Sequence, residues 1–145
     1  MKRFFYFPLL FILLLGCKKD KIDTQPDEIM KPLVGKWYLA EVEQLVNGEK
    51  VWVPFVGYEK IFMNFRFDGI LLDENGKTFC CVPQIYNINN TRFEVKPRAA
   101  VSYSANCSTT NCGVAFCSIY DITVSSEEMT ISNCNSFKSR YLKVK

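Results

Sequence analysis

The side chains that could carry chemistry in this chain are seven cysteines and fifteen Asp and Glu residues, because its 145 residues include no histidine. Without histidine, no Ser-His-Asp triad, Cys-His dyad or histidine-ligated metal site can form. Asp68, Asp73-Glu74 and Glu127-Glu128 fall in predicted turns, where a solvated carboxylate is the ordinary state. We therefore expect no catalytic residue, no metal and no cofactor, and predict that the protein is not an enzyme.

Cys17 ends a segment that is typical of an export signal. Lys2 and Arg3 precede an uncharged run over 4–16, which is shorter than the about 20 apolar residues that span a bilayer as a helix. The run ends in Leu14-Leu15-Gly16-Cys17, which resembles a bacterial lipobox, although Leu15 stands where a small residue is usual. The resemblance implies a lipoprotein in which residues 1–16 are removed as a signal peptide and Cys17 is acylated, for example with palmitate.

The next segment, 17–32, is predicted to be the lipidated cysteine and a flexible tether. Eight charged residues and two prolines in 18–32 leave too little apolar surface to offset the entropy of folding. By resemblance to Gram-negative sorting rules, Lys18 favours the outer membrane, and the sequence leaves open whether the domain faces the periplasm or the outside. Loss of Lys2 and Arg3 lowers the formal charge from +3 to +1, so we expect no nucleic-acid binding. Membrane attachment is expected through the N-terminal lipid.

Six cysteines remain if Cys17 carries lipid, and their even number in an exported domain indicates three disulfides. They are Cys80, Cys81, Cys107, Cys112, Cys117 and Cys134. The alternative, a zinc site, lacks the two-residue spacing between ligand cysteines and has no histidine to complete it. Cys80 and Cys81 can hardly bond to each other, because adjacent side chains leave opposite faces of a strand.

Residue alternation predicts one of the disulfide pairs. A strand that ends near Val124 and a strand that begins near Met129 are separated by a short polar turn, which indicates a hairpin. If Val124 opposes Met129, Cys117 and Cys134 lie on one outer face at a diagonal that a disulfide can bridge. The other four cysteines then pair between 80–81 and 107–112, in an order that the sequence leaves open.

The elements that must hold these cysteines are short strands. From residue 33 onward the apolar residues alternate with a period of two, and Asn47-Gly48, Asp68-Gly69 and Asn75-Gly76 supply hairpin turns. The pattern predicts an all-β domain over 33–145, a small antiparallel up-and-down barrel of about eight strands stapled by disulfides. Met63, Phe65 and Phe67 would point inward and fill much of its interior.

The two ends of this domain resemble the small lipocalin-like domains of bacterial lipoproteins. Gly35-Lys36-Trp37 opens the first predicted strand, and Arg140 lies in the last one. The resemblance implies that Trp37 plugs the closed base of an eight-stranded barrel and that Arg140 packs over its ring as a cation–π partner. The cysteine-rich segment 107–117 departs from that family's usual pattern.

An aromatic segment near the second strand is the candidate contact site. It contains Trp52, Phe55, Tyr58 and Phe62 together with Pro54 and Gly57. These residues could form a loop at the mouth of the barrel or pack as ordinary core residues. Glu41 and Glu43 share the predicted strand face of Trp37, so they either point into the mouth or lie beyond the core.

Two functional hypotheses follow. The first is a membrane-anchored lipocalin-like binding protein whose ligand, a small apolar molecule or a protein, is contacted at the barrel mouth. The alternative is a protein-interaction or inhibitor module of the lysozyme-inhibitor type, with no small-molecule ligand, that acts through the loop 97–113. In both cases we expect a monomer.

Overall fold

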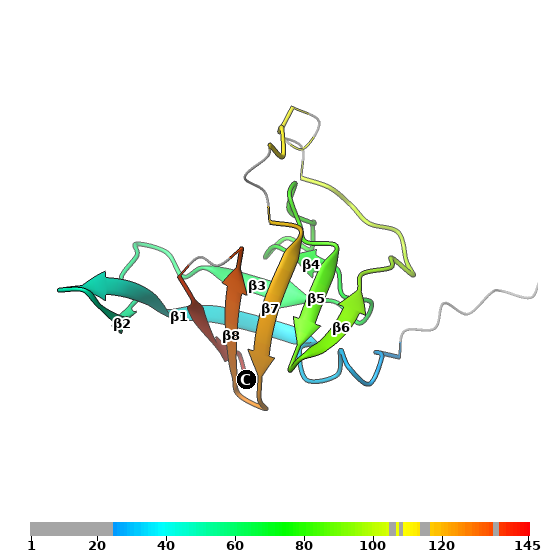
Figure 1. Cartoon of the computed structure of the whole chain (residues 1–145). Coiled ribbons are helices and arrows are strands. Elements are labelled where there is room, and N and C mark those ends of the chain that lie inside the picture. The colour runs from blue at the N-terminus through cyan, green and yellow to red at the C-terminus, as the bar shows by residue number, and fades with distance from the viewer. Residues whose placement is uncertain (1–24, 105–106, 108, 114–116, 135–136) are drawn as a thin grey trace, which may run out of the picture.

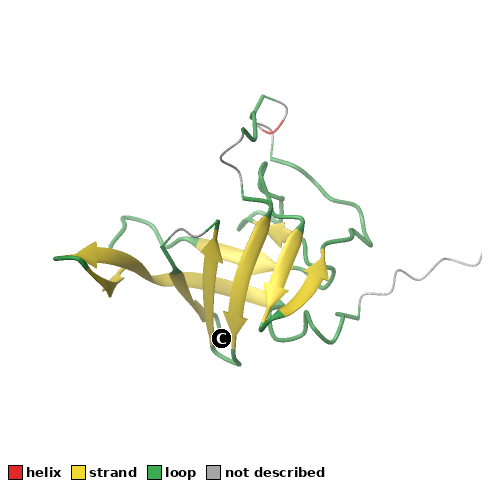
Figure 2. Cartoon of the chain, viewed as in Figure 1, coloured by secondary structure: helices red, strands yellow, loops and turns green. Residues whose placement is uncertain are grey.

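The computed structural model describes residues 25–104, 107, 109–113, 117–134 and 137–145. Within these residues the chain is all-β: nine strands form one sheet that curls into a half-barrel, and no α-helix occurs (Figures 1 and 2). The strands are β1 (Gly35–Val46), β2 (Glu49–Pro54), β3 (Phe62–Phe65), β4 (Leu71–Leu72), β5 (Ile85–Ile88), β6 (Thr91–Glu94), β7 (Ile119–Val124), β8 (Glu128–Asn133) and β9 (Ser139–Lys143). This part of the chain thus offers no helix that is long and apolar enough to cross a membrane.

The strand order is β4-β3-β1-β9-β8-β7-β5-β6, and β2 pairs with the second half of β1. Every pairing is antiparallel except that of β5 with β7. This exception corrects the predicted up-and-down, fully antiparallel order. After β6 the long connection 95–118 returns the chain to the far side of β5, so β7 runs in the same direction as β5.

Trp37 is completely buried at the base of the half-barrel, where its indole N–H donates a hydrogen bond of 2.7 Å to the Leu33 carbonyl. Met30 and Leu33 are also completely buried in the same core cluster. They lie in turns that begin at Asp27, whose carbonyl accepts the Met30 N–H at 2.9 Å. Residues 27–32 therefore belong to the folded domain, which corrects the prediction that the tether extends to residue 32.

The Gly-x-Trp pattern has a clear structural basis, with one change of partner. Gly35 has a φ of +122°, which favours glycine, and it leads the buried turns into β1. The cation over the Trp37 ring is Lys143, whose Nζ lies 5.0 Å from the ring centroid and which opposes Trp37 in the register of β1 and β9. The prediction that Arg140 covers Trp37 is wrong, because Arg140 lies three residues earlier and its side chain leaves the opposite face of β9.

A β-bulge in β1 changes which side chains face the core. Opposite β9 the register shifts between Leu39 and Glu41, so that Ala40 is the extra residue. Before the bulge the odd positions face inward, as Trp37 and Leu39 do; after it the even positions take that face. The prediction that Glu41 and Glu43 share the face of Trp37 is therefore wrong.

The inward row predicted for the third strand is confirmed for two of its three residues. Phe65 is buried, and Met63 is partly buried against the core. Phe67 instead follows the end of β3 and lies near the guanidinium groups of Arg66 and Arg98, whose central carbons are 5.7 and 5.1 Å from its ring centroid. The alternation ends at Phe65 because the chain turns there toward β4.

Three disulfides are present, as predicted. Cys117 bonds to Cys134, and Val124 opposes Met129 in the register from which this pair was inferred. The structure settles the order of the others: Cys80 bonds to Cys107 and Cys81 to Cys112. These two bonds hold the connection between β6 and β7 against the segment that precedes β5, which a small core needs for stability.

Candidate functional site

The second half of β1 and the whole of β2 form a two-stranded ribbon that protrudes from one end of the sheet (Figure 1). Asn47 and Gly48 join the strands in a two-residue turn with φ values of +53° and +86°, as in a type I′ hairpin. The loop that follows β2 returns to the sheet beside the bulge, where Leu39 N–H donates to the Ile61 carbonyl at 2.9 Å. We call residues 41–61 the ribbon end.

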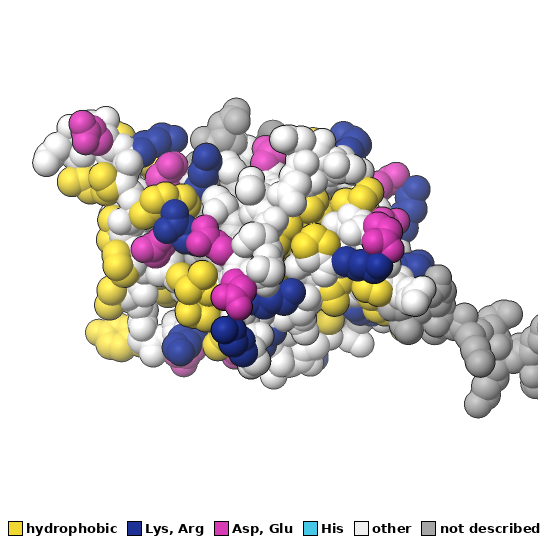
Figure 3. All heavy atoms as spheres, turned by 90° about the horizontal axis from the view of Figure 1, so that it is seen from below, with side chains coloured by type: hydrophobic (Ala, Val, Ile, Leu, Met, Phe, Trp, Pro, Cys, Tyr) yellow, Lys and Arg dark blue, Asp and Glu magenta, His cyan; other side chains and the backbone are white. Residues whose placement is uncertain are grey.

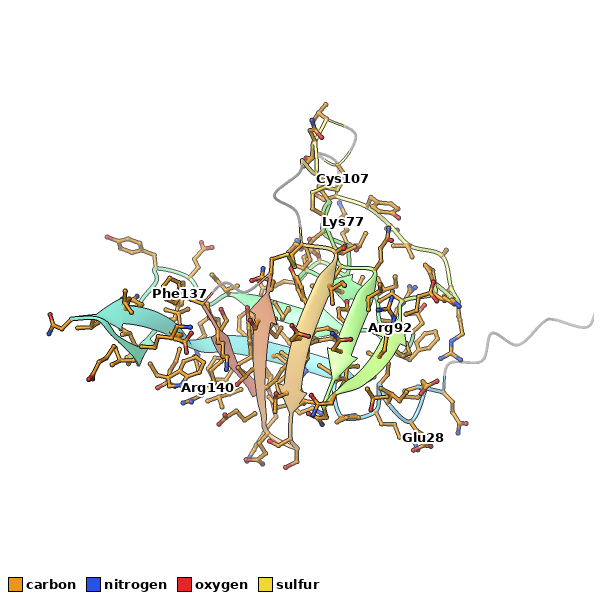
Figure 4. The ribbon with its side chains drawn as sticks, viewed as in Figure 1. Glu28, Lys77, Arg92, Cys107, Phe137 and Arg140 are labelled. Atoms are coloured by element: carbon orange, nitrogen blue, oxygen red, sulfur yellow. A yellow bond between two sulfur atoms is a disulfide. The ribbon has the colours of Figure 1, made fainter. Side chains whose placement is uncertain are left out.

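The outer face of the ribbon end carries a charged cluster built around Trp52. The Arg140 guanidinium lies 4.2 Å from the centre of the Trp52 ring system, so Arg140 serves this tryptophan rather than Trp37. Arg140 also forms a close ion pair with Glu41, and its Nε lies 3.4 Å from the Glu128 carboxylate. Figure 4 shows Arg140 and Phe137 at the end of the sheet from which the ribbon extends.

Lys50 connects the ribbon to the same outer surface. Its Nζ lies 3.3 Å from the Glu43 carboxylate and 5.7 Å from the centroid of the Phe137 ring. Glu43 is also bonded through its backbone to the residue before β9, because its N–H donates to the Lys138 carbonyl at 2.8 Å. Glu41 and Glu43 therefore act as ion-pair partners on the outer face, not as carboxylates inside a barrel mouth.

The opposite face of the ribbon is mostly apolar, with valine at four of its six positions. Because of the bulge and the β1–β2 register, the side chains that share this face are those of Val42, Gln44, Val46, Glu49, Val51 and Val53. Val42, Val51 and Val53 are half-buried but do not belong to the core cluster. The inner surface of the sheet thus continues onto the ribbon, beyond the residues that fill the half-barrel.

Exposed apolar side chains gather at this end of the molecule. Nine large hydrophobic residues are exposed in the described part of the chain, and six of them lie on the ribbon end or beside it. These six are Leu45, Val46, Val56, Tyr58, Ile61 and Phe137. Seen from below, the ribbon end shows hydrophobic side chains interspersed with both signs of charge (Figure 3).

The structure distributes the four predicted mouth residues over this end. Tyr58 is fully exposed in the loop, and Phe55 lines a shallow cavity of about 220 Å³ with Tyr38 and Lys60. Trp52 is half-buried under Arg140. Phe62 lies at the start of β3, where the Lys36 ammonium is 3.9 Å from its ring centroid. Cys17, the predicted lipidation site, lies outside the described residues.

A buried ion pair is the polar site that the sequence analysis missed. The Asp68 side chain is completely buried and accepts two hydrogen bonds of 2.8 Å from Arg66 and one of 2.8 Å from the Arg98 N–H. Burial opposes ionisation, but these hydrogen bonds and the Arg66 charge hold the pKa of Asp68 below its ordinary value. Asp68 is not the solvated turn residue that was predicted, and the spacing Arg-x-Asp is the sequence signal that could have revealed it.

This pair fixes the long connection after β6 to the turn after β3. Arg66 also donates to the carbonyls of Ala99 and Ala100, at 3.1 and 2.9 Å. Each of its bonds is to a protein group that it positions, so the geometry indicates a structural role. On the core side of the same turn, Tyr86 donates to the Gly69 carbonyl at 2.9 Å, and burial raises the pKa of that phenol.

A groove of about 520 Å³ runs beside the Cys81–Cys112 disulfide. Its apolar lining comes from Ile70, Val82, Val95, Pro97 and Tyr103. Part of the loop 97–113 therefore forms a groove wall that two disulfides tie to the segment before β5. Among the described residues no group of three or more His, Cys, Asp or Glu side chains is placed to hold a metal ion.

No family model, no characterised protein and no solved structure matches this chain.

Proposed function

We propose that this protein is a lipid-anchored binding protein of the bacterial cell envelope that contacts another protein through the ribbon end. The observation that carries the proposal is the gathering of six of the nine exposed large hydrophobic residues on or beside that end. Exposed apolar patches rimmed by charge are typical of protein contact sites. Ion pairs such as Arg140–Glu41 and Lys50–Glu43 supply that rim.

The filled interior supports a protein partner over a ligand held inside the barrel. Trp37, Met30 and Leu33 occupy the base, and Phe65 and Tyr86 pack edge to face, with ring centroids 5.7 Å apart. An eight-stranded barrel is only just wide enough for its own side chains, and this half-barrel is filled in the same way. The lipocalin-like resemblance then concerns the architecture of the base rather than a deep ligand cavity.

A lipid anchor on the N-terminal side would leave the ribbon end accessible to a partner. The described chain begins at Gln25, at the end of the molecule opposite to the ribbon (Figure 1). A lipid on Cys17 would attach the protein on the Gln25 side through the seven intervening residues. The anchor would then leave the ribbon end unobstructed, so that another protein of the envelope can reach it.

Site-specific photo-crosslinking in the native cells tests the proposal. A photoreactive amino acid at Tyr58 should give a discrete protein adduct, and the added substitution Val56→Asp should abolish it. Tyr103 is an exposed aromatic residue on the groove, far from the ribbon in sequence, and provides the matched control position. Adducts that form equally from both positions, or from Tyr103 alone, would contradict the ribbon end as the contact site.

The groove beside Cys81–Cys112 favours a second candidate function, the binding of a small apolar molecule. Its volume of about 520 Å³ is in the range of ligand pockets. Native mass spectrometry of the protein purified from its host would show a bound mass that the Tyr103→Ala variant loses. A protein free of any small molecule in that measurement would leave the ribbon end as the functional surface.

A further inference from the structure

The outer edge of β2 is an unused strand edge, since β2 pairs only with β1 among the described strands. In a two-residue hairpin the closing pair, here Val46 and Glu49, exchanges backbone hydrogen bonds, and alternate pairs follow it. The bond from Phe55 N–H to the Ala40 carbonyl, 2.8 Å, falls in that same alternation. The backbone N–H and C=O groups of Lys50 and Trp52 must therefore point away from β1.

This edge is complementary to itself. If two copies of β2 pair in antiparallel fashion about a two-fold axis at Val51, Lys50 of each copy opposes Trp52 of the other, and both residues offer outward backbone groups. On the outer face each ammonium then lies beside an indole, and on the other face the two Val51 side chains meet. An axis at Trp52 would set Lys50 opposite Pro54, which has no N–H to donate.

The second open edge, β6, is less suited to this pairing. Its outward positions by the same reasoning are Arg92 and Glu94. Residues 25–28 line a shared cavity with Phe93 and Glu94, so the N-terminal segment already lies beside this edge. The β2 edge instead adjoins the exposed apolar side chains of the ribbon end.

We infer that the partner of the ribbon end is a second copy of this chain, joined through antiparallel β2–β2 pairing with Lys50 opposite Trp52. This inference rests on the proposed function of the ribbon end as a protein contact site, and it names that partner. It also replaces the expectation of a monomer.

A charge exchange at the axis tests both the dimer and its register. Two differently tagged copies of the full-length protein are produced together in the native host, extracted in detergent and captured through one tag. Wild-type copies should co-purify, whereas Val51→Glu or Val51→Lys alone should reduce recovery of the second tag at least tenfold, because like charges oppose each other. The mixture of Val51→Glu with Val51→Lys should restore recovery. Val51 lies outside the core cluster, so these variants should fold.

A second pair of variants tests the backbone contact itself. Lys50→Pro removes an outward N–H and should abolish co-purification, while Arg92→Pro at the equivalent position of the β6 hairpin should leave it intact. Loss of co-purification in Arg92→Pro but not in Lys50→Pro would overturn the inference, as would failure of the charge exchange. If the wild-type copies do not co-purify while Tyr58 still cross-links to a different protein, the second copy is excluded but the proposed function stands. If neither occurs, both fail.

Discussion

The two tryptophans of this protein have the same kind of partner and opposite surroundings. Trp37 at the base lies under Lys143, and Trp52 on the ribbon end lies under Arg140, so β9 supplies a cation to each. Trp37 is completely buried and its indole N–H has a backbone acceptor, the Leu33 carbonyl. Trp52 is only half-buried and lies among exposed charged and apolar groups.

The difference shows that the cation does not decide the role of an aromatic residue. At the base, apolar neighbours remove the ring from water, and that burial contributes most of its stabilising free energy. On the ribbon end the same stacking leaves part of the ring accessible, and that surface is available to a partner. We therefore expect the base to determine stability and the ribbon end to determine binding.

The largest expected effect tests the base. Trp37→Ala should lower the free energy of unfolding by about 3–5 kcal/mol, because it leaves a cavity among Met30, Leu33 and the sheet. Denaturant unfolding followed by circular dichroism measures it. A loss below about 1 kcal/mol would show that Trp37 is not the structural centre of the base.

The second largest effect on stability compares a buried ion pair with one that is accessible to water. Asp68→Asn should cost about 2–4 kcal/mol, because it breaks a hydrogen-bonded pair whose carboxylate is completely buried. Glu41→Gln on the ribbon end removes a pair with Arg140 that is accessible to water and should cost about 1 kcal/mol or less. Equal losses in the two variants would remove the distinction between the regions.

The pH dependence of Asp68→Asn gives an independent measure. The pKa of Asp68 in the folded protein lies below its ordinary value of 3.8, so its contribution to stability is complete above that pH and is lost as the pH falls through the lowered pKa. The stability difference between wild type and Asp68→Asn should therefore be constant at neutral pH and narrow in acid. If this assignment were wrong, thermal unfolding between pH 7 and pH 2 would show a stability difference between the two proteins that does not change with pH.

A smaller effect on stability is expected at Trp52. Trp52→Ala should cost about 1 kcal/mol, because it removes a partly exposed cation–π contact and no core packing. The same variant should weaken capture of the partner strongly, since tryptophan is frequently a binding hot spot. A loss of 3–5 kcal/mol, like that expected for Trp37, would make Trp52 structural and would end the proposed contrast.

The smallest effect on stability belongs to Tyr58. Tyr58→Ser should change the free energy of unfolding by less than about 0.5 kcal/mol, because the side chain is fully exposed. Partner recovery should nevertheless fall. Unchanged recovery with unchanged stability would place the contact surface elsewhere.

Residue alternation and turn residues were sufficient to predict a good part of the fold. Alternation around Val124 and Met129 predicted both the register of β7 with β8 and the disulfide between Cys117 and Cys134, because a hairpin joins residues that are close in sequence. The period of two and the turn signals similarly predicted an all-β sheet. Such features depend on neighbours a few residues away, which the sequence displays directly.

The candidate site was predicted less well because one extra residue in β1 reverses which of the following side chains face the core. Ala40 carries no mark of a bulge, yet the register shift there turns Glu41 and Glu43 outward and moves the valines of the ribbon to the inner face. The role of Arg140 changed for a related reason. Whether a cation of β9 reaches Trp37 or Trp52 depends on which face of the strand it occupies, and the registry with β1 decides that.

By itself, then, the sequence determined an all-β, disulfide-stapled domain, because hydrophobic period, turn residues and cysteine count are local or additive properties; the tryptophan at its base was implied only by a resemblance. Only the tertiary structure decided that Met30 completes the core, that Asp68 is buried against Arg66, that β5 and β7 run parallel and that the ribbon carries its apolar residues into solvent. Each of these depends on contacts between segments distant in the chain. Long-range pairing is set by the combined packing of the whole sheet, which no single stretch of residues contains.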